Sequence, residues 1–129
     1  MRFLVDTHAL LWWWAHAEKL SGRVRALIRD PSNTILVSAA SSWEIATKYR
    51  IGKLPSGARI VQTWDSRMQT SAFTELPVTS AHASKSGILP GDHRDPFDRM
   101  IAAQSLIEHI SVLSIDSAIS ELGADRIWD

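Results

Sequence analysis

Short apolar runs alternate along this chain with longer stretches in which apolar residues recur three and four positions apart. Brief runs rich in branched side chains are typical of buried strands, and the spaced stretches are typical of helices with one apolar face. The pattern predicts strands at residues 2–5, 34–37, 73–76, 111–115 and 126–128. It predicts helices at residues 7–15, 18–29, 41–50, 57–68, 97–110 and 117–122, and a loop at residues 86–96, which contain two Gly and two Pro.

The alternation of strands and helices predicts an α/β fold, with a mostly parallel sheet covered by helices on both faces. No repeat and no linker rich in Gly, Ser or Pro divides the chain, so we expect residues 1–129 to form a single domain. Ligands of such sheets bind beyond the carboxyl ends of the strands. The residues that follow each strand are therefore the candidates for a functional site.

Acidic residues stand at nearly every one of these junctions. Asp6 follows the first strand directly, and Asp116 follows residues 112–115 in the same way. Glu44 is expected in the first turn of the helix after the second strand, and Asp98 in the first turn of the long helix after Asp95-Pro96. If the strands are parallel, these carboxylates converge on one edge of the sheet.

Helix capping is the alternative explanation for each of these acids. The free amides at the start of a helix favour a carboxylate, Ser41 with Glu44 fits a capping box, and Asp95 fits an N-cap followed by proline. Ser, Thr or Asn would cap equally well, however, so capping does not require four charges on one edge. Like charges that close together repel unless a cation lies among them or some of the carboxyls are protonated.

The composition narrows the chemistry. The 129 residues include no Cys, which excludes thiolate ligands and a thiol nucleophile, and an oxygen-only ligand set suits Mg²⁺ or Mn²⁺. The 14 basic residues balance the 14 acidic ones, which argues against nucleic-acid binding through a large basic field. A cation held by carboxylates would restore positive charge locally, and phosphodiester hydrolysis is the chemistry that such an ion supports.

Four stretches, in order, resemble the signature stretches of PIN-domain toxins of the VapC type. They are LVDTH at residues 4–8 with LWW at 11–13, SWEIATK at 42–48 with GKL at 52–54, HRDPFDRMIAAQ at 93–104, and LSID at 113–116. The resemblance covers essentially the whole chain. It implies a three-layer α/β/α PIN-like fold, Mg²⁺- or Mn²⁺-dependent endoribonuclease activity on RNA, and inhibition by a cognate VapB-type antitoxin. We also expect a homodimer.

The resemblance also assigns roles within the acidic set Asp6, Glu44, Asp98 and Asp116. Asp6 would be the central metal ligand, and Asp98 and Asp116 would complete the coordination directly or through water. Glu44 would act in the outer part of the site. Asp95 suits an N-cap but could also orient water, so it ranks below Asp98.

Several neighbouring residues carry a structural and a functional interpretation. Thr7 and Ser114 could fix the rotamer of a carboxylate or satisfy a strand end, and we favour the second role. Arg99 and Arg94 could contact the phosphate of a substrate, although Arg99 could equally pair with Asp95 or Asp98. Lys48 lies four residues after Glu44 and is expected to pair with it.

Two residue types allow further hypotheses. The five histidines, His8, His16, His82, His93 and His109, show no ligand spacing, so we expect structural or surface roles, with His93 ordering its loop. Three consecutive tryptophans, Trp12 to Trp14, cannot all face one core, so at least one is expected to point outward as a contact for the antitoxin or a second copy.

Competing functions are less consistent with the sequence. A non-catalytic PIN-like binding module is the main alternative, and retention of all four acids argues against it. A receiver domain needs paired early acids and a lysine after a late strand, whereas Asp6 is single and no lysine follows residues 113–115. A phosphatase of the haloacid type would have an aspartate at the position of His8. The apolar stretch at residues 9–15 is too short to span a bilayer, so we expect a cytoplasmic protein without a membrane anchor.

Overall fold

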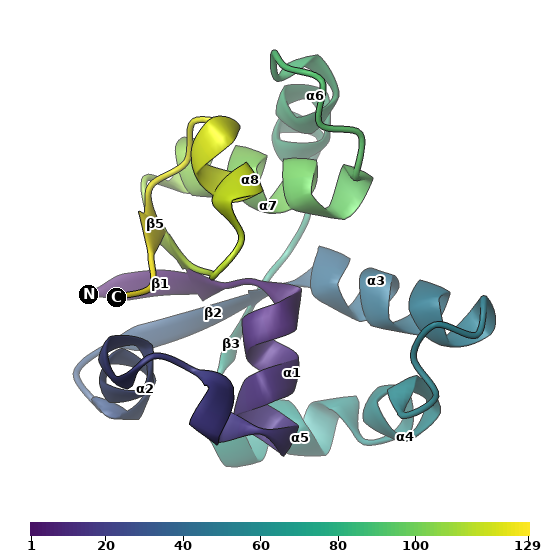
Figure 1. The fold of residues 1–129 in the computed structure, drawn as a ribbon, viewed down its shortest axis with the longest axis vertical. Helices are drawn as coiled ribbons and strands as arrows, with labels where there is room; N and C mark the ends of the chain where they lie inside the picture. The colour runs from purple at the N-terminus through teal and green to yellow at the C-terminus, as the bar shows by residue number, and fades with distance from the viewer.

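A five-stranded parallel sheet forms the centre of the computed structural model, which describes residues 1–129 (Figure 1). The strands lie in the order β3-β2-β1-β4-β5, and every neighbouring pair is parallel. Their bounds are β1 Arg2–Val5, β2 Thr34–Ser38, β3 Thr74–Leu76, β4 Ser111–Leu113 and β5 Arg126–Ile127. The predicted parallel sheet is therefore confirmed, including a short edge strand near residue 126.

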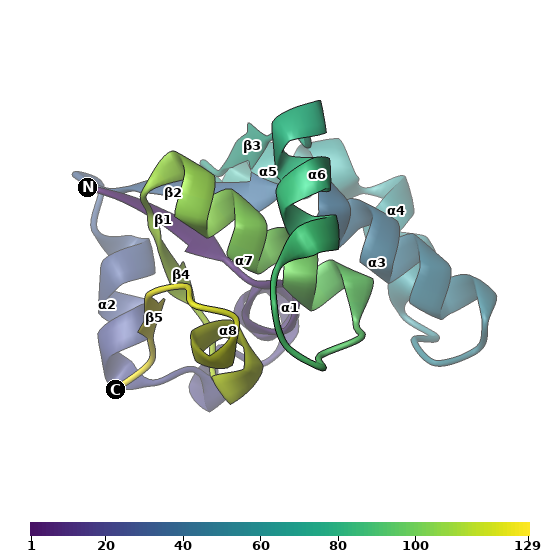
Figure 2. The same cartoon turned by 90° about the horizontal axis from the view of Figure 1, so that it is seen from above.

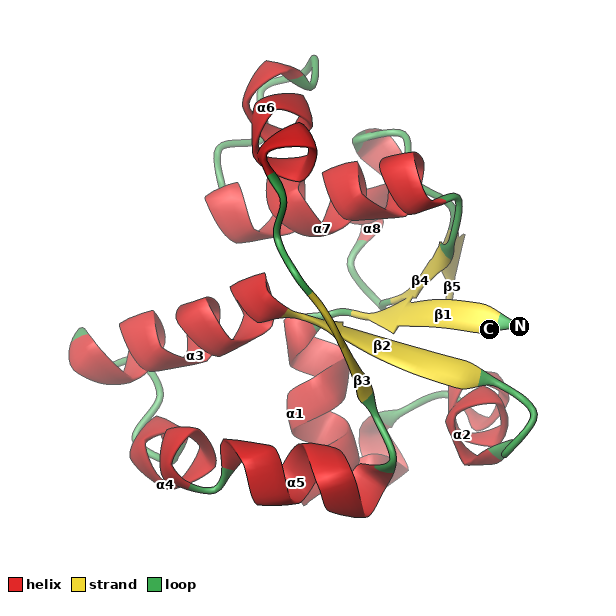
Figure 3. Ribbon diagram, turned by 180° about the vertical axis from the view of Figure 1, so that it is seen from behind, coloured by secondary structure: helices red, strands yellow, loops and turns green.

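Helices cover both faces of this sheet. The α-helices are α1 Thr7–Ala15, α2 Gly22–Arg29, α3 Ala39–Arg50, α4 Gly57–Gln62, α5 Trp64–Ser71, α6 Ser80–Ile88, α7 Pro96–Glu108 and α8 Ser117–Glu121, with a 3₁₀ turn at Ala17–Lys19. Figures 1 and 3 show α6, α7 and α8 on one side of the sheet and α1, α2 and α5 on the other. The α/β/α prediction is confirmed.

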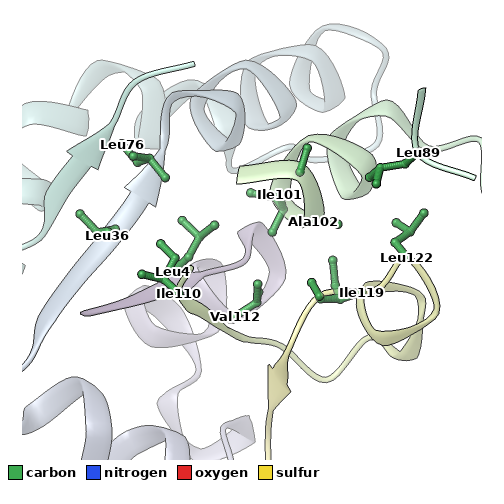
Figure 4. Close-up of a cluster of buried hydrophobic side chains, with 12 residues drawn as sticks. Leu4, Leu36, Leu76, Leu89, Ile101, Ala102, Ile110, Val112, Ile119 and Leu122 are labelled. Carbon is green, nitrogen blue, oxygen red and sulfur yellow. The ribbon is translucent and has the colours of Figure 1, made fainter. Parts of the chain in front are cut away.

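The alternation of side chains along the strands explains the two cores. Leu4 of β1 faces the α7 side, in a buried cluster with Ile101, Val112 and Ile119 (Figure 4). Its neighbours in the strand, Phe3 and Val5, face the α1 side and belong to a second buried cluster. Because successive strand residues point to opposite faces, a strand buried on both faces has an apolar residue at every position.

The order of the strands creates a switch point at the centre of the sheet. The chain runs outward from β1 to β2 and β3, and then returns to the other side of β1 to form β4 and β5. The backbone N–H of Asp6 still bonds to the carbonyl of Leu113 at 3.2 Å, just beyond the paired strand residues. Since ligands of open α/β sheets bind where the strand order reverses, the ends of β1 and β4 are the place to look for a site.

Some predicted element bounds are wrong, for local reasons. The helix expected at 18–29 begins only at Gly22, because the hydroxyl of Ser21 caps it by accepting from the N–H of Val24 at 3.1 Å. The helix expected at 57–68 is two helices that meet at Thr63. The strand expected at 111–115 ends at Leu113.

Helix α6 extends into the segment that was predicted to be a loop. Residues 86–88 belong to this helix and not to the predicted loop, which starts only after Ile88. The helix begins with a capping box in which Thr79 bonds to the backbone of His82 and the ring of His82 bonds back to the N–H of Thr79. His82 is fully buried and also bonds to Glu108 of α7 at 3.0 Å. Figure 2 shows α6 lying across α7, so packing between helices supports a segment whose own sequence is weakly amphipathic.

The three consecutive tryptophans are all half-buried against the second core cluster. The expectation that at least one points outward therefore holds only in part, because none of the three lies fully on the open surface. No helix of this chain is long and apolar enough to cross a membrane.

The packing around the central strand gives a direct test. Leu4 is completely buried, so Leu4→Ala is expected to lower the free energy of unfolding by about 3–4 kcal/mol through lost apolar contact and an unfilled cavity. Ile88→Ala is the control, because Ile88 is 80% exposed and its truncation is expected to change the free energy by less than about 0.5 kcal/mol. Urea denaturation measures both, and equal effects would contradict the assignment of the core.

Candidate functional site

The carboxyl end of the sheet carries a cavity of about 300 Å³ lined by five acidic side chains. They are Asp6, Glu44, Asp95, Asp98 and Asp116, so the structure brings together all four predicted site acids and the secondary candidate Asp95. Lys48, Lys53, Thr7 and His8 also line this cavity. The parallel arrangement of β1, β2 and β4 produces this convergence, as the sequence predicted.

Three of the acids also cap helices. Asp6 accepts from the N–H of Ala9 at 2.8 Å at the start of α1, and Asp116 accepts from the N–H of Ala118 at 2.9 Å at the start of α8. Asp95 accepts from the N–H of Phe97 at 2.9 Å at the start of α7. The capping interpretation is therefore confirmed for these three positions, and capping places their side chains at the cavity.

Glu44 is not a cap. Helix α3 begins at Ala39 with Ser38 as its N-cap, so the predicted capping box of Ser41 and Glu44 is wrong, and Glu44 lies beyond the first turn. Its buried carboxylate accepts a hydrogen bond from Lys48, as the spacing of four residues predicted. Partial burial alone would lower the pKa of Lys48, but the hydrogen bond and charge of Glu44, with the charges of Asp95 and Asp98, raise it overall.

Asp6 is the most perturbed carboxyl group of the cavity. It is 7% exposed, and burial raises its pKa to about 6, with the charges of Asp98 and Asp116 adding to the rise. The hydroxyl of Ser114, which donates to Oδ2 of Asp6, and the N–H of Ala9 partly offset that rise. A buried carboxylate beside two others is a group whose charge is not compensated by the protein alone.

The two hydroxyl candidates have different roles. Ser114 orients Asp6 directly and also accepts from the N–H of Asp116 at 3.0 Å, so the strand-end role favoured for it from the sequence is incomplete. Thr7 contacts no carboxylate; its hydroxyl donates to Oγ of Ser41 at 2.9 Å and ties the start of α1 to α3. This contact with a helix differs from the strand-end role that the sequence favoured for Thr7.

Asp98 is joined to the loop before α7. Its Oδ2 lies 2.9 Å from Nε2 of His93, which fits the loop-ordering role expected for that histidine. Burial raises the pKa of Asp98, the His93 contact opposes this, and the nearby charges of Asp95, Asp116 and Glu44 raise it further. Asp98 thus experiences the same concentration of negative charge as Asp6.

Arg99 has neither of the roles weighed from the sequence. It makes no ion pair with Asp95 or Asp98 and does not line the cavity; its guanidinium donates instead to the carbonyls of Ser86 and His93, each at 3.0 Å, and of Gly87 and Leu89. It therefore fixes the connection between α6 and α7 that leads to Asp95. Arg94 is exposed and does not line the cavity either.

The chemistry of the cavity matches a divalent cation, although its coordination is not preassembled. The acidic side chains are all oxygen donors. Burial is the main cause of the raised pKa values of Asp6 and Asp98, and neighbouring negative charges, which a cation would offset, add to the rise. No three Asp, Glu or His side chains lie close enough together to hold a metal ion in the present arrangement. Each carboxylate has a local partner instead, so the side chains would have to move to bind a metal ion together.

Sequence reasoning did not identify His8 as a residue of the cavity. His8 follows Asp6 by two positions, in the first turn of α1, and this placement after the central strand was the available signal. Burial and the charge of Lys48 lower the pKa of His8, and the charges of Asp116 and Glu44 oppose this. Leu54, in the matched stretch GKL, likewise lines the cavity without having been assigned a role.

Comparison with known proteins gives a consistent result. The PIN domain family model matches residues 3–125. Ribonuclease VapC16 of Mycobacterium tuberculosis is 43% identical over 60 residues, which are 46% of this chain and 43% of that protein. The matched segment therefore spans less than half the length of that relative.

Solved structures share the fold along the whole chain. A VapBC2 complex of Rickettsia felis, bound to a DNA fragment from its promoter, has a chain that matches with a TM-score of 0.71 at 16% identity, over 100% of both chains. The toxin VapC20 of Mycobacterium tuberculosis, described as cleaving the sarcin-ricin loop, matches with a TM-score of 0.69 at 16% identity, over 98% of this chain and 99% of that one. These likenesses confirm the three-layer fold.

The burial of Asp6 gives a pH-dependent prediction for the metal-free protein. Because the folded-state pKa is raised from 3.8 to about 6, ionisation of Asp6 removes stability as pH rises through that window. At pH 7.5 the free energy of unfolding of Asp6→Asn is expected to exceed that of the wild type by about 2–3 kcal/mol. Near pH 4 the two free energies are expected to be equal. Denaturation in EDTA at the two pH values measures this difference. Exposed Asp65→Asn is the control, and a difference for Asp6→Asn that did not depend on pH would contradict the assigned cause.

The contacts of Arg99 give a second prediction. Arg99→Lys keeps the charge but loses the planar set of donors, and is expected to cost about 2 kcal/mol of stability and to expose the α6–α7 connection to protease. Limited proteolysis with mass mapping of the fragments locates the cleavage. Arg94→Lys is the matched control, and equal protease sensitivity of the two variants would contradict the role given to Arg99.

Proposed function

Because this chain belongs to the PIN-domain family, we propose that it is a Mg²⁺- or Mn²⁺-dependent endoribonuclease, acting in the cytoplasm as the toxin of a type II toxin–antitoxin pair. The observation that supports this most is the cavity with five acidic side chains at the switch point of the sheet. Ribonuclease VapC16, which shares 43% identity over the matched segment, supports RNA as the substrate class. Residues 1–129 would act as one domain.

Asp6, Asp98 and Asp116 are the proposed metal ligands. Asp6 lies at the end of the central strand, and the other two approach it from the starts of α7 and α8. A divalent ion held there would lower the pKa of water and stabilise the charge that develops on the leaving oxygen of a phosphodiester. The ion would also offset the repulsion among these carboxylates, which adds to the rise that burial causes in the pKa values of Asp6 and Asp98.

Other side chains of the chain position these groups. Ser114 fixes the rotamer of Asp6, and Lys48 holds Glu44 in the outer part of the cavity. Asp95 shapes the start of α7 through its cap, which supports a structural role over a ligand role. Lys48 and Lys53 place two positive charges beside the acidic set, where they would contact the phosphates of bound RNA.

The biological partners follow from the same proposal. The Rickettsia felis structure is a VapBC2 assembly, which supports a VapB-type antitoxin as the partner of this chain. We also propose that the chain forms a homodimer. A non-catalytic PIN-like binding module remains the second candidate, because no three acidic or imidazole groups are preassembled around one point.

Graded loss of activity tests the proposal. In Mn²⁺, Asp6→Asn is expected to lower the rate of RNA cleavage by about 100-fold or more, and Ser114→Ala by about 10-fold, because the hydroxyl acts only through Asp6. EDTA is expected to abolish cleavage and Mn²⁺ to restore it. Asp65→Asn, outside the cavity, serves as the control.

The same experiment separates the two candidate functions. RNA cleavage that persists in excess EDTA or in Asp6→Asn would contradict the metal-dependent mechanism. Calorimetric Mn²⁺ binding without any cleavage of RNA would favour the non-catalytic module.

A further inference from the structure

A second cavity of about 460 Å³ lies beside the carboxylate cavity, between α1 and the chain that forms α4 and α5. The two cavities share His8, Leu11 and Leu54 in their walls, so they are neighbours. Figure 3 shows α1 lying close to α5, and there Trp14 packs edge-on against Trp64 at 5.5 Å between ring centroids. We call this second cavity the tryptophan groove.

Aromatic rings form much of the groove wall. Trp12 and Trp14 both line it, and the ring of His8 lies 4.2 Å from that of Trp12 where the groove meets the carboxylate cavity. Both indoles are half-buried, and each has a cation over its ring, with Lys19 at 6.0 Å from the centroid of Trp12 and Arg67 at 5.4 Å from that of Trp14. Half-buried aromatic rings beside cationic side chains are suited to contacts with the bases and phosphates of a single strand.

The charge of the groove is positive and not compensated. Arg59 and Arg67 line it, neither forms a salt bridge, and the groove contains no acidic residue. Arg67 is held in place by the hydroxyl of Thr63, at 2.8 Å from its Nε, and by the ring of Trp14, 5.4 Å away. Arg59 is exposed and makes no side-chain hydrogen bond. Such a groove favours a ligand that combines an anion with a flat ring.

We propose that the tryptophan groove binds the nucleotide adjacent to the scissile phosphate of single-stranded RNA. Its phosphate would bind Arg59 and Arg67, and its base would lie against the exposed parts of the Trp12 and Trp14 indoles. The inference rests on the proposed ribonuclease function, and the groove has the volume of a small-ligand site. An apolar segment of a partner protein fits less well, because it would bury both guanidinium groups without a counter-charge.

Binding of a fluorescein-labelled single-stranded oligoribonucleotide, followed by anisotropy in Ca²⁺ with its intactness checked on a gel, tests the proposal. The double variant Arg59→Gln, Arg67→Gln is expected to raise Kd about 10-fold or more. It is also expected to reduce the slope of log K against log salt by about 1.4, the value for two lost phosphate contacts with a single strand. In cleavage assays KM should rise while kcat changes little.

Matched variants separate binding in the groove from a general effect of losing positive charge. Arg25→Gln with Arg29→Gln removes the same charge from α2, where neither side chain makes a hydrogen bond or ion pair, and is expected to leave Kd nearly unchanged. Arg59→Lys with Arg67→Lys should retain most of the affinity. The indole N–H resonances of Trp12 and Trp14, assigned by single Trp→Phe substitutions, should shift when the oligonucleotide is added.

The outcomes distinguish the groove from the ribonuclease proposal. RNA binding equal to the wild type in the double glutamine variant, a loss equal to that of the α2 variant, or unshifted indole resonances would overturn the groove assignment even if the protein cleaves RNA. Groove-dependent RNA binding without cleavage would support the groove and overturn the ribonuclease. If the double glutamine variant bound RNA like the wild type but was no longer inhibited by an antitoxin peptide, the groove would be assigned to a protein partner. That result would overturn the RNA proposal.

Discussion

The burial of one carboxylate at the end of the central strand constrains the rest of this molecule. Asp6 is covered by α1, bonded by Ser114 beyond β4, and close to the charges of Asp98 and Asp116. Removing a carboxylate from water is costly, and neighbouring like charges add to the cost. The apolar clusters on the two faces of the sheet provide the stabilisation that offsets this cost, because they fix β1 and β4 side by side whatever the state of the carboxyl group.

The acids of the cavity have a structural and a chemical role at once. Asp6, Asp95 and Asp116 each satisfy free amides at the start of a helix, and the same residues line one cavity at the sheet edge. The choice between a cap and a functional residue is therefore not exclusive at these positions. The helix starts supply positive partial charge to groups that would otherwise repel one another.

The sequence predicted those parts of the fold and site that depend on local order. Asp6 and Asp116 follow strands, and Lys48 lies one helical turn after Glu44, so their positions could be deduced from neighbours along the chain. Helix α6 could not be deduced in this way, because its start depends on the buried ring of His82, which bonds to another helix. The four carbonyls that Arg99 reaches, and the shared wall at His8, likewise depend on how distant segments pack.

The pairing of Asp6 with Ser114 joins residues that are 108 positions apart, so it sets the order in which the site can be assembled. A chain emerging from the ribosome presents Asp6 well before β4 has been made. Contacts between such distant residues form late, after the cost of closing the intervening loop has been met. A nascent chain therefore has Asp6 long before it has the complete acidic cavity, and only the folded chain brings the five acids together.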